Sequence, residues 1–264
     1  MTTATQTTAP AKKLVKFKKT KVHTRYKTAE GLIVPGVTTV IGQSLGWNKH
    51  VLMAWQKREL LAGNDPDKIR DKAADIGTLS HFMVECHAKG QEPDTSEFSA
   101  ADIDKAENGF LGFLEWEQQY APEYIGSEIK MVSEKYNFGG TADFIARLGK
   151  KLVLLDLKTS KGVYIDHKIQ VAAYKYAYEE QTGQMIDQVH ILKLDKNTGA
   201  FEHVPILNQE IENCFLIFLH CLALYNLKKI TDNPAKANGK IIPALYQSIR
   251  NQAATIHHYY RLAS

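Results

Sequence analysis

The chain has 264 residues, with 33 Lys and Arg against 29 Asp and Glu, so its formal net charge is +4. Hydrophobic residues make up 44% and charged residues 23%, as in an ordinary globular protein of one large or two small domains. Residues 1–29 carry eight basic side chains and no acidic one, which leaves a net charge of −4 on the rest. This uneven distribution excludes a uniformly basic, histone-like protein.

The three cysteines, Cys86, Cys214 and Cys221, are too few for a disulfide framework and are typical of a reducing compartment. No CxxC pair is present, which excludes a zinc ribbon and a four-cysteine iron–sulfur cluster. Without a GxxxxGK[ST] or GxGxxG loop, the sequence predicts no nucleotide cofactor. No run reaches the ~18 apolar residues of a membrane span and no apolar leader is seen, so we expect a cytoplasmic protein without membrane contact.

In chain order, the sequence predicts an arm and then helices. Residues 1–29 are expected to form a disordered basic arm. Residues 31–46 are β-branched and broken by Pro35 and Gly36, which predicts turns and a short strand. Three segments then have helical patterns: 48–62, Asp65 to about Ala88, and the stretch from the capping residue Ser99 to Pro122.

Side-chain spacing predicts two details of these helices. In the first helix, Leu52, Trp55 and Leu60 are expected to face the core. In the second, Gly77 is expected to interrupt the helix because glycine is a poor helix former.

After residue 122 the hydrophobic pattern changes to that of strands. The predicted strands are 123–134, 141–148, 152–158, 187–194 and 200–207, with turns at 137–140 and 149–151. A helix is predicted at about 166–182, ending at Gly183, and a helical tail from 208 with a break near Asn233-Pro234. This order of elements predicts an α/β (α+β) fold with a central mixed β-sheet flanked by helices.

Three polar residues interrupt otherwise apolar strands. Asp156 and Lys158 are two residues apart on one strand, so both side chains project from the same face, and the hairpin brings Asp143 across from them. Burying these charges is costly unless they pair with one another or bind a metal. A structural ion pair is one interpretation, and a Mg²⁺ or Mn²⁺ site built on carboxylate oxygens is the other.

Four ordered motifs favour the metal site. They are Gly77…His81, Gly140…Asp143, Asp156-Leu157-Lys158-Thr159-Ser160 and Gln170…Tyr174. Together they resemble the PD-(D/E)XK nuclease superfamily, and within it the RecB-like exonuclease branch. The motifs lie between residues 77 and 174, which is less than half of the chain.

This resemblance implies a restriction-endonuclease-like core with N- and C-terminal helical additions. It implies one nuclease domain over residues 30–264, with the motif core at about 77–207 and a helical C-terminal extension at about 208–264. The implied activity is that of a Mg²⁺- or Mn²⁺-dependent DNA exonuclease that hydrolyses phosphodiester bonds with metal-activated water. Stand-alone relatives of this kind serve phage or bacterial DNA recombination, repair or processing.

The resemblance also implies roles for single residues. Asp143 and Asp156 are the expected carboxylate ligands of the metal, the backbone carbonyl of Leu157 completes its shell, and Lys158 is the expected catalytic lysine. His81 is the expected additional ligand, although taken alone it reads as a core residue. The implied substrate-binding residues are Thr159, Ser160, Gln170 and Tyr174. Two further candidates for the site are Glu85 and Glu128.

Other readings and partners stay open at this point. The helix carrying Gln170 and Tyr174 could be an ordinary amphipathic helix, and Lys161, Lys168 and Trp47 could contact DNA or solvent. The alternatives to an exonuclease are a non-catalytic DNA-end or recombinase-binding protein and a restriction-type endonuclease. Expected partners are single- or double-stranded DNA ends, a single-strand annealing or recombination protein, and further copies of the chain. The acidic stretch 85–134 is expected to face away from DNA.

Overall fold

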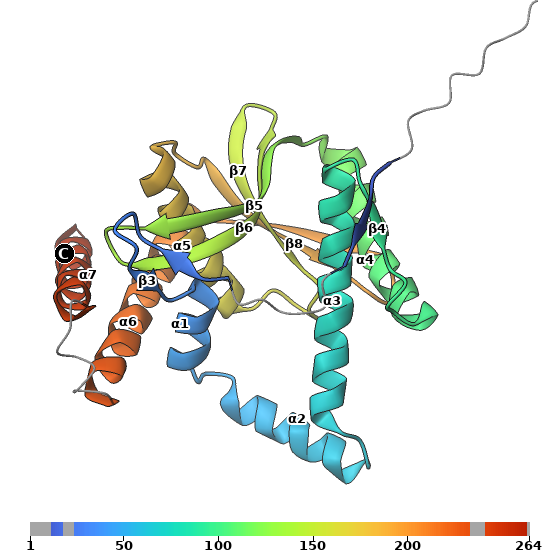
Figure 1. The fold of residues 1–264 in the computed structure, drawn as a ribbon, viewed down its shortest axis with the longest axis horizontal. Coiled ribbons are helices and arrows are strands. Elements are labelled where there is room, and N and C mark those ends of the chain that lie inside the picture. Colours follow the sequence, from blue (N-terminus) through green and yellow to red (C-terminus); the bar gives the residue numbers. More distant parts are fainter. Residues whose placement is uncertain (1–11, 18–23, 233–240, 263–264) are drawn as a thin grey trace, which may run out of the picture.

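The computed structural model describes residues 12–17, 24–232 and 241–262 (Figure 1). A five-stranded sheet in the order β5-β6-β7-β8-β9 forms its centre. The strands β7 and β8 are parallel and the other neighbours are antiparallel, so the predicted mixed sheet is confirmed. The strands are β5 (Glu123–Ser133), β6 (Phe138–Leu148), β7 (Lys151–Lys158), β8 (Gln188–Leu194) and β9 (Phe201–Ile206).

Helices cover both faces of this sheet (Figure 1). On one face α1 (Val37–Ser44), α5 (Ile165–Thr182) and α6 (Asn208–Asp232) enclose the largest apolar cluster, which includes Phe138 and Leu154. On the other face α3 (Pro66–Ala88) and α4 (Ala100–Tyr120) cover Leu155 and Leu157. Because β7 is buried on both faces, its run from Leu152 to Leu155 is uniformly apolar rather than alternating.

Helix α6 is long and apolar enough to cross a membrane by length and composition alone. Its residues Phe215, Phe218 and Leu219 lie in the main apolar cluster. The core helix of a globular domain passes the same test, and here α6 packs against α1 and α5 while Phe218 contacts the ring of Phe138 in β6. Helix α7 (Ile241–Leu262) then packs on α6, and the break predicted near Asn233-Pro234 lies outside the described residues.

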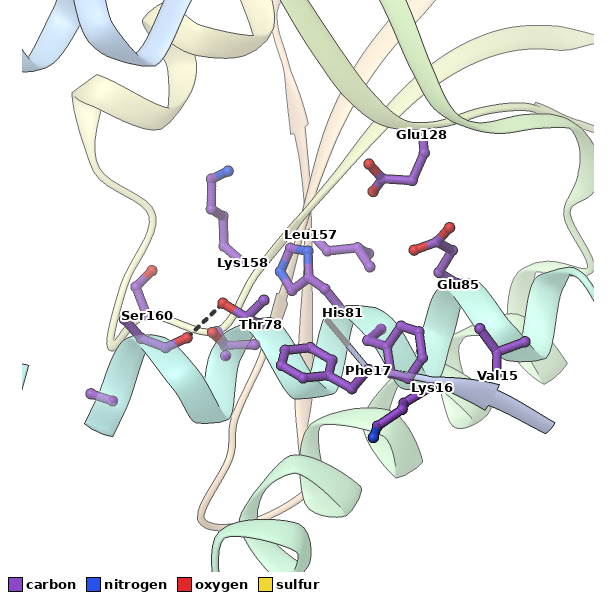
Figure 2. Close-up of a pocket in the computed structure, with 15 residues that line it drawn as sticks. Val15, Lys16, Phe17, Thr78, His81, Glu85, Glu128, Leu157, Lys158 and Ser160 are labelled. Carbon is purple, nitrogen blue, oxygen red and sulfur yellow. Dashed lines mark hydrogen bonds between the residues drawn. The ribbon is translucent and has the colours of Figure 1, made fainter. Parts of the chain in front are cut away.

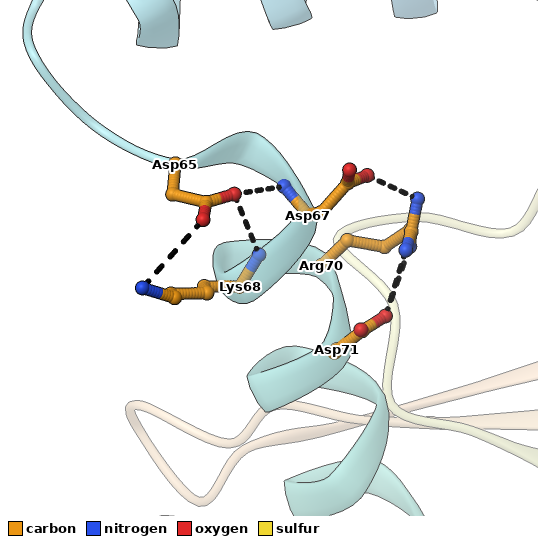
Figure 3. Close-up of polar contacts among 5 residues, drawn as sticks. All are labelled: Asp65, Asp67, Lys68, Arg70 and Asp71. Carbon is orange, nitrogen blue, oxygen red and sulfur yellow. Dashed lines mark hydrogen bonds and ion pairs between the residues drawn. The ribbon is translucent and has the colours of Figure 1, made fainter.

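Helix α3 begins at Pro66 with a well-formed cap (Figure 3). The Asp65 carboxylate accepts hydrogen bonds from the backbone N–H groups of Asp67 (3.0 Å) and Lys68 (3.2 Å), as an N-cap residue should. The helix then continues through Gly77 without a break, so the predicted interruption is wrong. The glycine has a steric reason instead: a Cβ at this position would lie 2.5 Å from Thr159 Oγ1.

The Gly139-Gly140 pair belongs to β6 and not to a turn, since the strand begins at Phe138. A Cβ on Gly139 would lie 2.2 Å from the ring of Tyr26, and one on Gly140 would lie 2.4 Å from the ring of Tyr174. Two tyrosine rings therefore pack directly on the strand backbone. The sequence alone could not distinguish this role of the glycines from a turn, because a Gly-Gly pair is typical both of turns and of strands packed closely against another group.

Helix α2 (Lys49–Leu61) has the predicted bounds but not the predicted inward face. It has no buried residue, and Leu52 and Leu60 are 50% and 62% exposed. The reason is its position: α2 lies at the edge of the molecule beside α3, away from the sheet (Figure 1). Helix α1, which precedes α2, was not predicted: residues 31–46 were expected to form turns and a short strand. The structure has a strand of only two residues there, β3 (Ile33–Val34), followed by α1.

The basic arm is partly structured, so the prediction that residues 1–29 are disordered is wrong for the segments described. Strand β1 (Leu14–Lys16) pairs in parallel with β4 (Glu92–Asp94), and β2 (Tyr26–Lys27) pairs with β3. Phe17 is 8% exposed and contacts two aromatic rings of the body. Burial of these apolar side chains outweighs the tendency of a basic segment to stay in solvent. Residues 1–11 and 18–23 lie outside the described residues.

A pair of histidines, His190 buried and His203 half-buried, joins β8 and β9. His190 Nδ1 and His203 Nε2 are 2.8 Å apart, and the His203 ring packs against Trp116 and Tyr120 of α4. Burial, followed by the charge of its neighbour, lowers the pKa of His190 to about 4. Both rings are therefore neutral at pH 7, and one donates its N–H to the other.

Candidate active site

A pocket of about 690 Å³ opens between α3 and the carboxyl end of β7 (Figure 2). Its walls come from β1, α3, β5 and the loop after β7, and include His81, Glu85, Glu128, Lys158 and Thr159. Four segments far apart in sequence thus supply polar side chains to one cavity, as is typical of an active site.

Asp156 and Lys158 form an ion pair at the end of β7. Lys158 Nζ lies 2.5 Å from Asp156 Oδ2, and the two side chains are 15% and 1% exposed. The strand period of two places both on the same face, as the sequence predicted. Burial raises the pKa of Asp156 to about 6, with the nearby Asp143 carboxylate adding to the increase and the Lys158 ammonium opposing it. This site therefore holds a carboxylate that strongly favours a positive neighbour.

Asp143, on the adjacent strand β6, connects β7 to α3. Its Oδ2 accepts a hydrogen bond of 2.7 Å from the Leu157 N–H and lies 3.8 Å from His81 Nδ1. Burial alone would raise the pKa of Asp143, but His81, Lys158 and this N–H outweigh it, so the pKa is lowered. The pKa of Asp143 is thus lowered while that of Asp156 is raised. Opposite pKa shifts in neighbouring carboxylates are associated with functional sites.

His81 approaches the carboxylates from α3. Burial alone would lower its pKa, but the Asp143 and Asp156 charges outweigh burial and the opposing Lys158 charge, and the pKa is raised. Its side chain is 29% exposed and faces the pocket (Figure 2). The close approach of α3 to the loop after β7 depends on Gly77, one helical turn earlier. His81 therefore lines the pocket beside Asp143 and belongs to none of the apolar clusters that the described residues form.

Glu85 and Glu128 point toward one another across the pocket (Figure 2). Ser127 pairs with Phe144 and Ile129 with Ala142, which sets Glu128 opposite Asp143. Desolvation of its carboxyl, followed by the charges of Asp143 and Glu85, raises the pKa of Glu128 to about 7. Its φ of 52° is in the left-handed region, where a non-glycine residue is strained, and such strain is concentrated at functional sites.

The predicted substrate-binding residues divide into two groups. Thr159 and Ser160 line the pocket directly. Tyr174 is 4% exposed, and its hydroxyl accepts a hydrogen bond of 2.8 Å from Gln170 Nε2. Burial, followed by the Asp156 charge, raises the pKa of Tyr174, which puts the hydroxyl close to the carboxylates. This burial is better suited to support of the site than to direct contact with a substrate.

Three further features of the site were missed by sequence reasoning. Val15 and Lys16 of the supposed disordered arm line the pocket. The Tyr26 hydroxyl lies 2.9 Å from Thr141 Oγ1, and burial, with a smaller contribution from the Glu128 charge, raises its pKa. Burial, followed by the Lys158 charge, lowers the pKa of His167 to about 4. None of them belongs to a motif, and only tertiary structure brings them here.

The donor atoms are of the right kind for a hard divalent cation. Asp143 and Asp156 offer carboxylate oxygens, Leu157 a carbonyl oxygen and His81 an imidazole nitrogen. Asp156 Oδ2 is buried and accepts no directed hydrogen bond from the described residues, and its charge is compensated by the Lys158 ion pair and, more weakly, by His81. Within that part of the chain, no three His, Cys, Asp or Glu side chains are gathered at metal-binding distance. The donor atoms are therefore of the kind that binds a divalent cation, and Lys158 neutralises Asp156 in this structure.

The chain was compared with known protein families, curated proteins and solved structures. An alkaline exonuclease, LHK-Exo, from Laribacter hongkongensis aligns with 15% identity over 60% of this chain and 84% of its own, with a TM-score of 0.30. LHK-Exo in complex with dAMP aligns with 16% identity over 62% and 91%, with a TM-score of 0.28. Scores this low carry no argument about function, and no curated protein matches the sequence. The family model of the PD-(D/E)XK nuclease superfamily matches residues 25–257, most of the chain, and the protein belongs to that superfamily.

Proposed function

We propose that the protein is a Mg²⁺- or Mn²⁺-dependent DNA exonuclease. The observation that carries this proposal is the meeting of Asp143, Asp156, Lys158 and His81 from β6, β7 and α3 beside one open pocket. The pKa values of the two carboxylates are displaced in opposite directions, which is a costly arrangement for a purely structural ion pair.

Each residue has a role that its surroundings support. Asp143, Asp156 and the Leu157 carbonyl would hold the cation, with His81 as a further ligand. When bound, such a cation polarises a phosphate and lowers the pKa of a coordinated water. Lys158 would orient the attacking water and offset the negative charge that develops on the phosphate. The Leu157 N–H fixes Asp143, and the Gln170–Tyr174 pair supports the floor beneath both carboxylates.

The choice of an exonuclease rests on the resemblance of the His81 element and the Gln170–Tyr174 helix to the RecB-like branch. A role in phage or bacterial DNA recombination, repair or processing, and cooperation with a single-strand annealing or recombination protein in the cytoplasm, are parts of the same proposal. A closed circular plasmid tests the branch directly. An exonuclease degrades the linearised plasmid and leaves the closed circle intact, whereas a restriction-type endonuclease cuts both.

Substitution of the two central residues tests the chemistry. We expect Asp156→Ala and Lys158→Ala to lower cleavage of end-labelled DNA with Mg²⁺ or Mn²⁺ by about 10²-fold or more. Lys150→Ala is the matched control, because Lys150 is an exposed lysine in the turn at the opposite end of β7. Cleavage by either active-site variant at the rate of this control would refute the assignment. Labelling at the 5′ or the 3′ end, on single- or double-stranded DNA and on RNA, also gives polarity and substrate preference.

A further inference from the structure

A second pocket, of about 400 Å³, adjoins the candidate active site. The two pockets share Ala73 of α3 and Thr159 and Ser160 of the loop after β7. The second pocket is therefore an immediate neighbour of the first, on the other side of residues that line both. The shared residues include two that the family motif already associates with substrate.

Four lysines from four separate elements line this second pocket. Lys72 is on α3, Lys105 on α4, Lys161 in the loop after β7, and Lys196 in the turn between β8 and β9. These elements meet here only in the folded chain, so the cluster does not result from one basic run in the sequence. The stretch 85–134, which contains Lys105, is otherwise strongly acidic.

The carboxylates of Asp102 and Asp195 interact with these lysines and compensate part of their positive charge. Lys72 pairs with Asp102 at 3.1 Å, and Lys196 Nζ donates to the Ala73 carbonyl at 2.9 Å. Within the described residues, Lys105 and Lys161 have no ion pair. The carboxylate of Asp195, which also lines the pocket, accepts hydrogen bonds from two backbone N–H groups of its own turn.

The lysines also repel one another. Burial, followed by the charge of Lys105, lowers the pKa of Lys196. Like charges held together around a cavity cost free energy unless an anion binds among them. The Ala73 carbonyl fixes Lys196 in place, so its ammonium is held at the pocket instead of moving away into solvent.

We infer that this lysine pocket binds backbone phosphates of the strand under cleavage, next to the scissile phosphate. The inference rests on the proposed function, since the continuity with the active site identifies the anion as part of the same nucleic-acid strand. Ammonium groups bind phosphates as point charges without reading bases, so the pocket contributes affinity and register but no sequence preference. It also brings one residue of the acidic stretch, Lys105, onto the DNA side of the molecule.

Binding of single-stranded DNA at several salt concentrations, measured by fluorescence anisotropy in EDTA, tests this inference. The test variant is Lys105→Gln with Lys161→Gln, and the matched control is Lys150→Gln with Lys151→Gln, two exposed lysines at the far end of β7. Loss of two phosphate contacts should make the slope of log K against log salt shallower by about 1.4 for a single strand. Affinity at low salt should fall by roughly ten-fold, while the control keeps the wild-type slope.

Cleavage separates this inference from the proposed function. At saturating DNA the test variant should cut at close to the wild-type kcat, with a raised KM, because the reacting groups are untouched. Wild-type cleavage that depends on Asp156, together with an unchanged salt slope in the test variant, would overturn the lysine pocket and leave the nuclease intact. A changed slope in a protein that never cuts DNA would support the pocket and refute the catalytic proposal.

Two controls complete the experiment. Equal melting temperatures for the two double variants show that the fold is kept, and both variants replace exposed lysines. Inorganic phosphate, titrated at constant ionic strength, distinguishes a site for the free ion. A phosphate-dependent rise in melting temperature that the test variant loses, without any change in its DNA salt slope, would overturn the assignment to a nucleic-acid strand.

Discussion

Gly140→Ala is a sensitive test of how the sheet supports the site. A Cβ at residue 140 would lie 2.4 and 2.7 Å from two ring carbons of Tyr174, whereas relaxed carbon contacts are about 3.5–4.0 Å. The ring is buried in the main apolar cluster and its hydroxyl is bonded to Gln170, so it has no free space into which to turn. Either the strand or the ring must therefore move by roughly 1 Å.

The energetic balance of this substitution has two opposing parts. Overpacking a buried site costs about 1–3 kcal/mol, and replacing glycine by alanine within a strand returns about 0.5–1 kcal/mol. We expect a net destabilisation of about 1–2 kcal/mol, which at this chain length corresponds to a melting temperature lower by several degrees. The effect on cleavage should be larger, since a displacement of about 1 Å near reacting groups can cost about 10²-fold in rate.

Urea denaturation and cleavage assays on three variants check this reasoning. Gly42→Ala is the control, because Gly42 is a helical glycine with nothing within 4 Å of the added carbon and should be stabilised. In a Tyr174→Ala background, Gly140→Ala should no longer destabilise the protein, so the coupling energy between the two positions should equal the Gly140→Ala penalty in size. If Gly140→Ala behaves like Gly42→Ala in both stability and activity, the packing argument is refuted.

Three further predictions follow from the geometry. Gly77→Ala should reduce cleavage because its methyl group would meet Thr159 Oγ1. Adding Thr159→Ala should remove that penalty in the double variant. Equal activity of Gly77→Ala and wild type would contradict this contact. His190 stays neutral in the fold down to a pKa of about 4 but takes up a proton below pH ~6.5 when unfolded, so stability should be lost as pH falls across this window, by roughly 1 kcal/mol per pH unit. Urea denaturation of His190→Asn should show a flatter pH dependence, and the exposed His220→Asn should not. Mn²⁺ should raise the melting temperature of the wild type and leave Asp156→Ala unchanged, and an equal rise in both would exclude Asp156 as a ligand.

The sequence predicted the central part of the site because its geometry is set by local periodicity. A strand alternates its side chains every two residues, so Asp156 and Lys158 had to share a face, and a short hairpin had to bring Asp143 beside them. The continuous apolar run before Asp156 likewise predicted a strand covered on both faces. These features depend on few residues close in sequence, which is why the structure keeps them.

The features that the sequence did not predict depend on distant partners. Gly139 and Gly140 look like a turn until Tyr26 and Tyr174 are placed against them. Leu52 and Leu60 have the spacing of a buried face, but α2 lies at the edge of the fold and has no sheet to cover. Spacing identifies which side chains share a helix face, and only the tertiary arrangement decides whether that face meets another element.

The N-terminal segment shows how charge counting alone misplaces a function. The net charge of residues 1–29 suggested a disordered arm in solvent, yet Val15 and Lys16 line the candidate active-site pocket and Phe17 packs on the rings of Phe82 and Phe98. Burial of one such aromatic side chain contributes about 1.5–3 kcal/mol, which is a large part of the stability of an ordinary domain. A truncation that removes this strand would therefore open a wall of the pocket as well as remove charge. The arm is therefore part of the pocket wall, held there by the packing of Phe17.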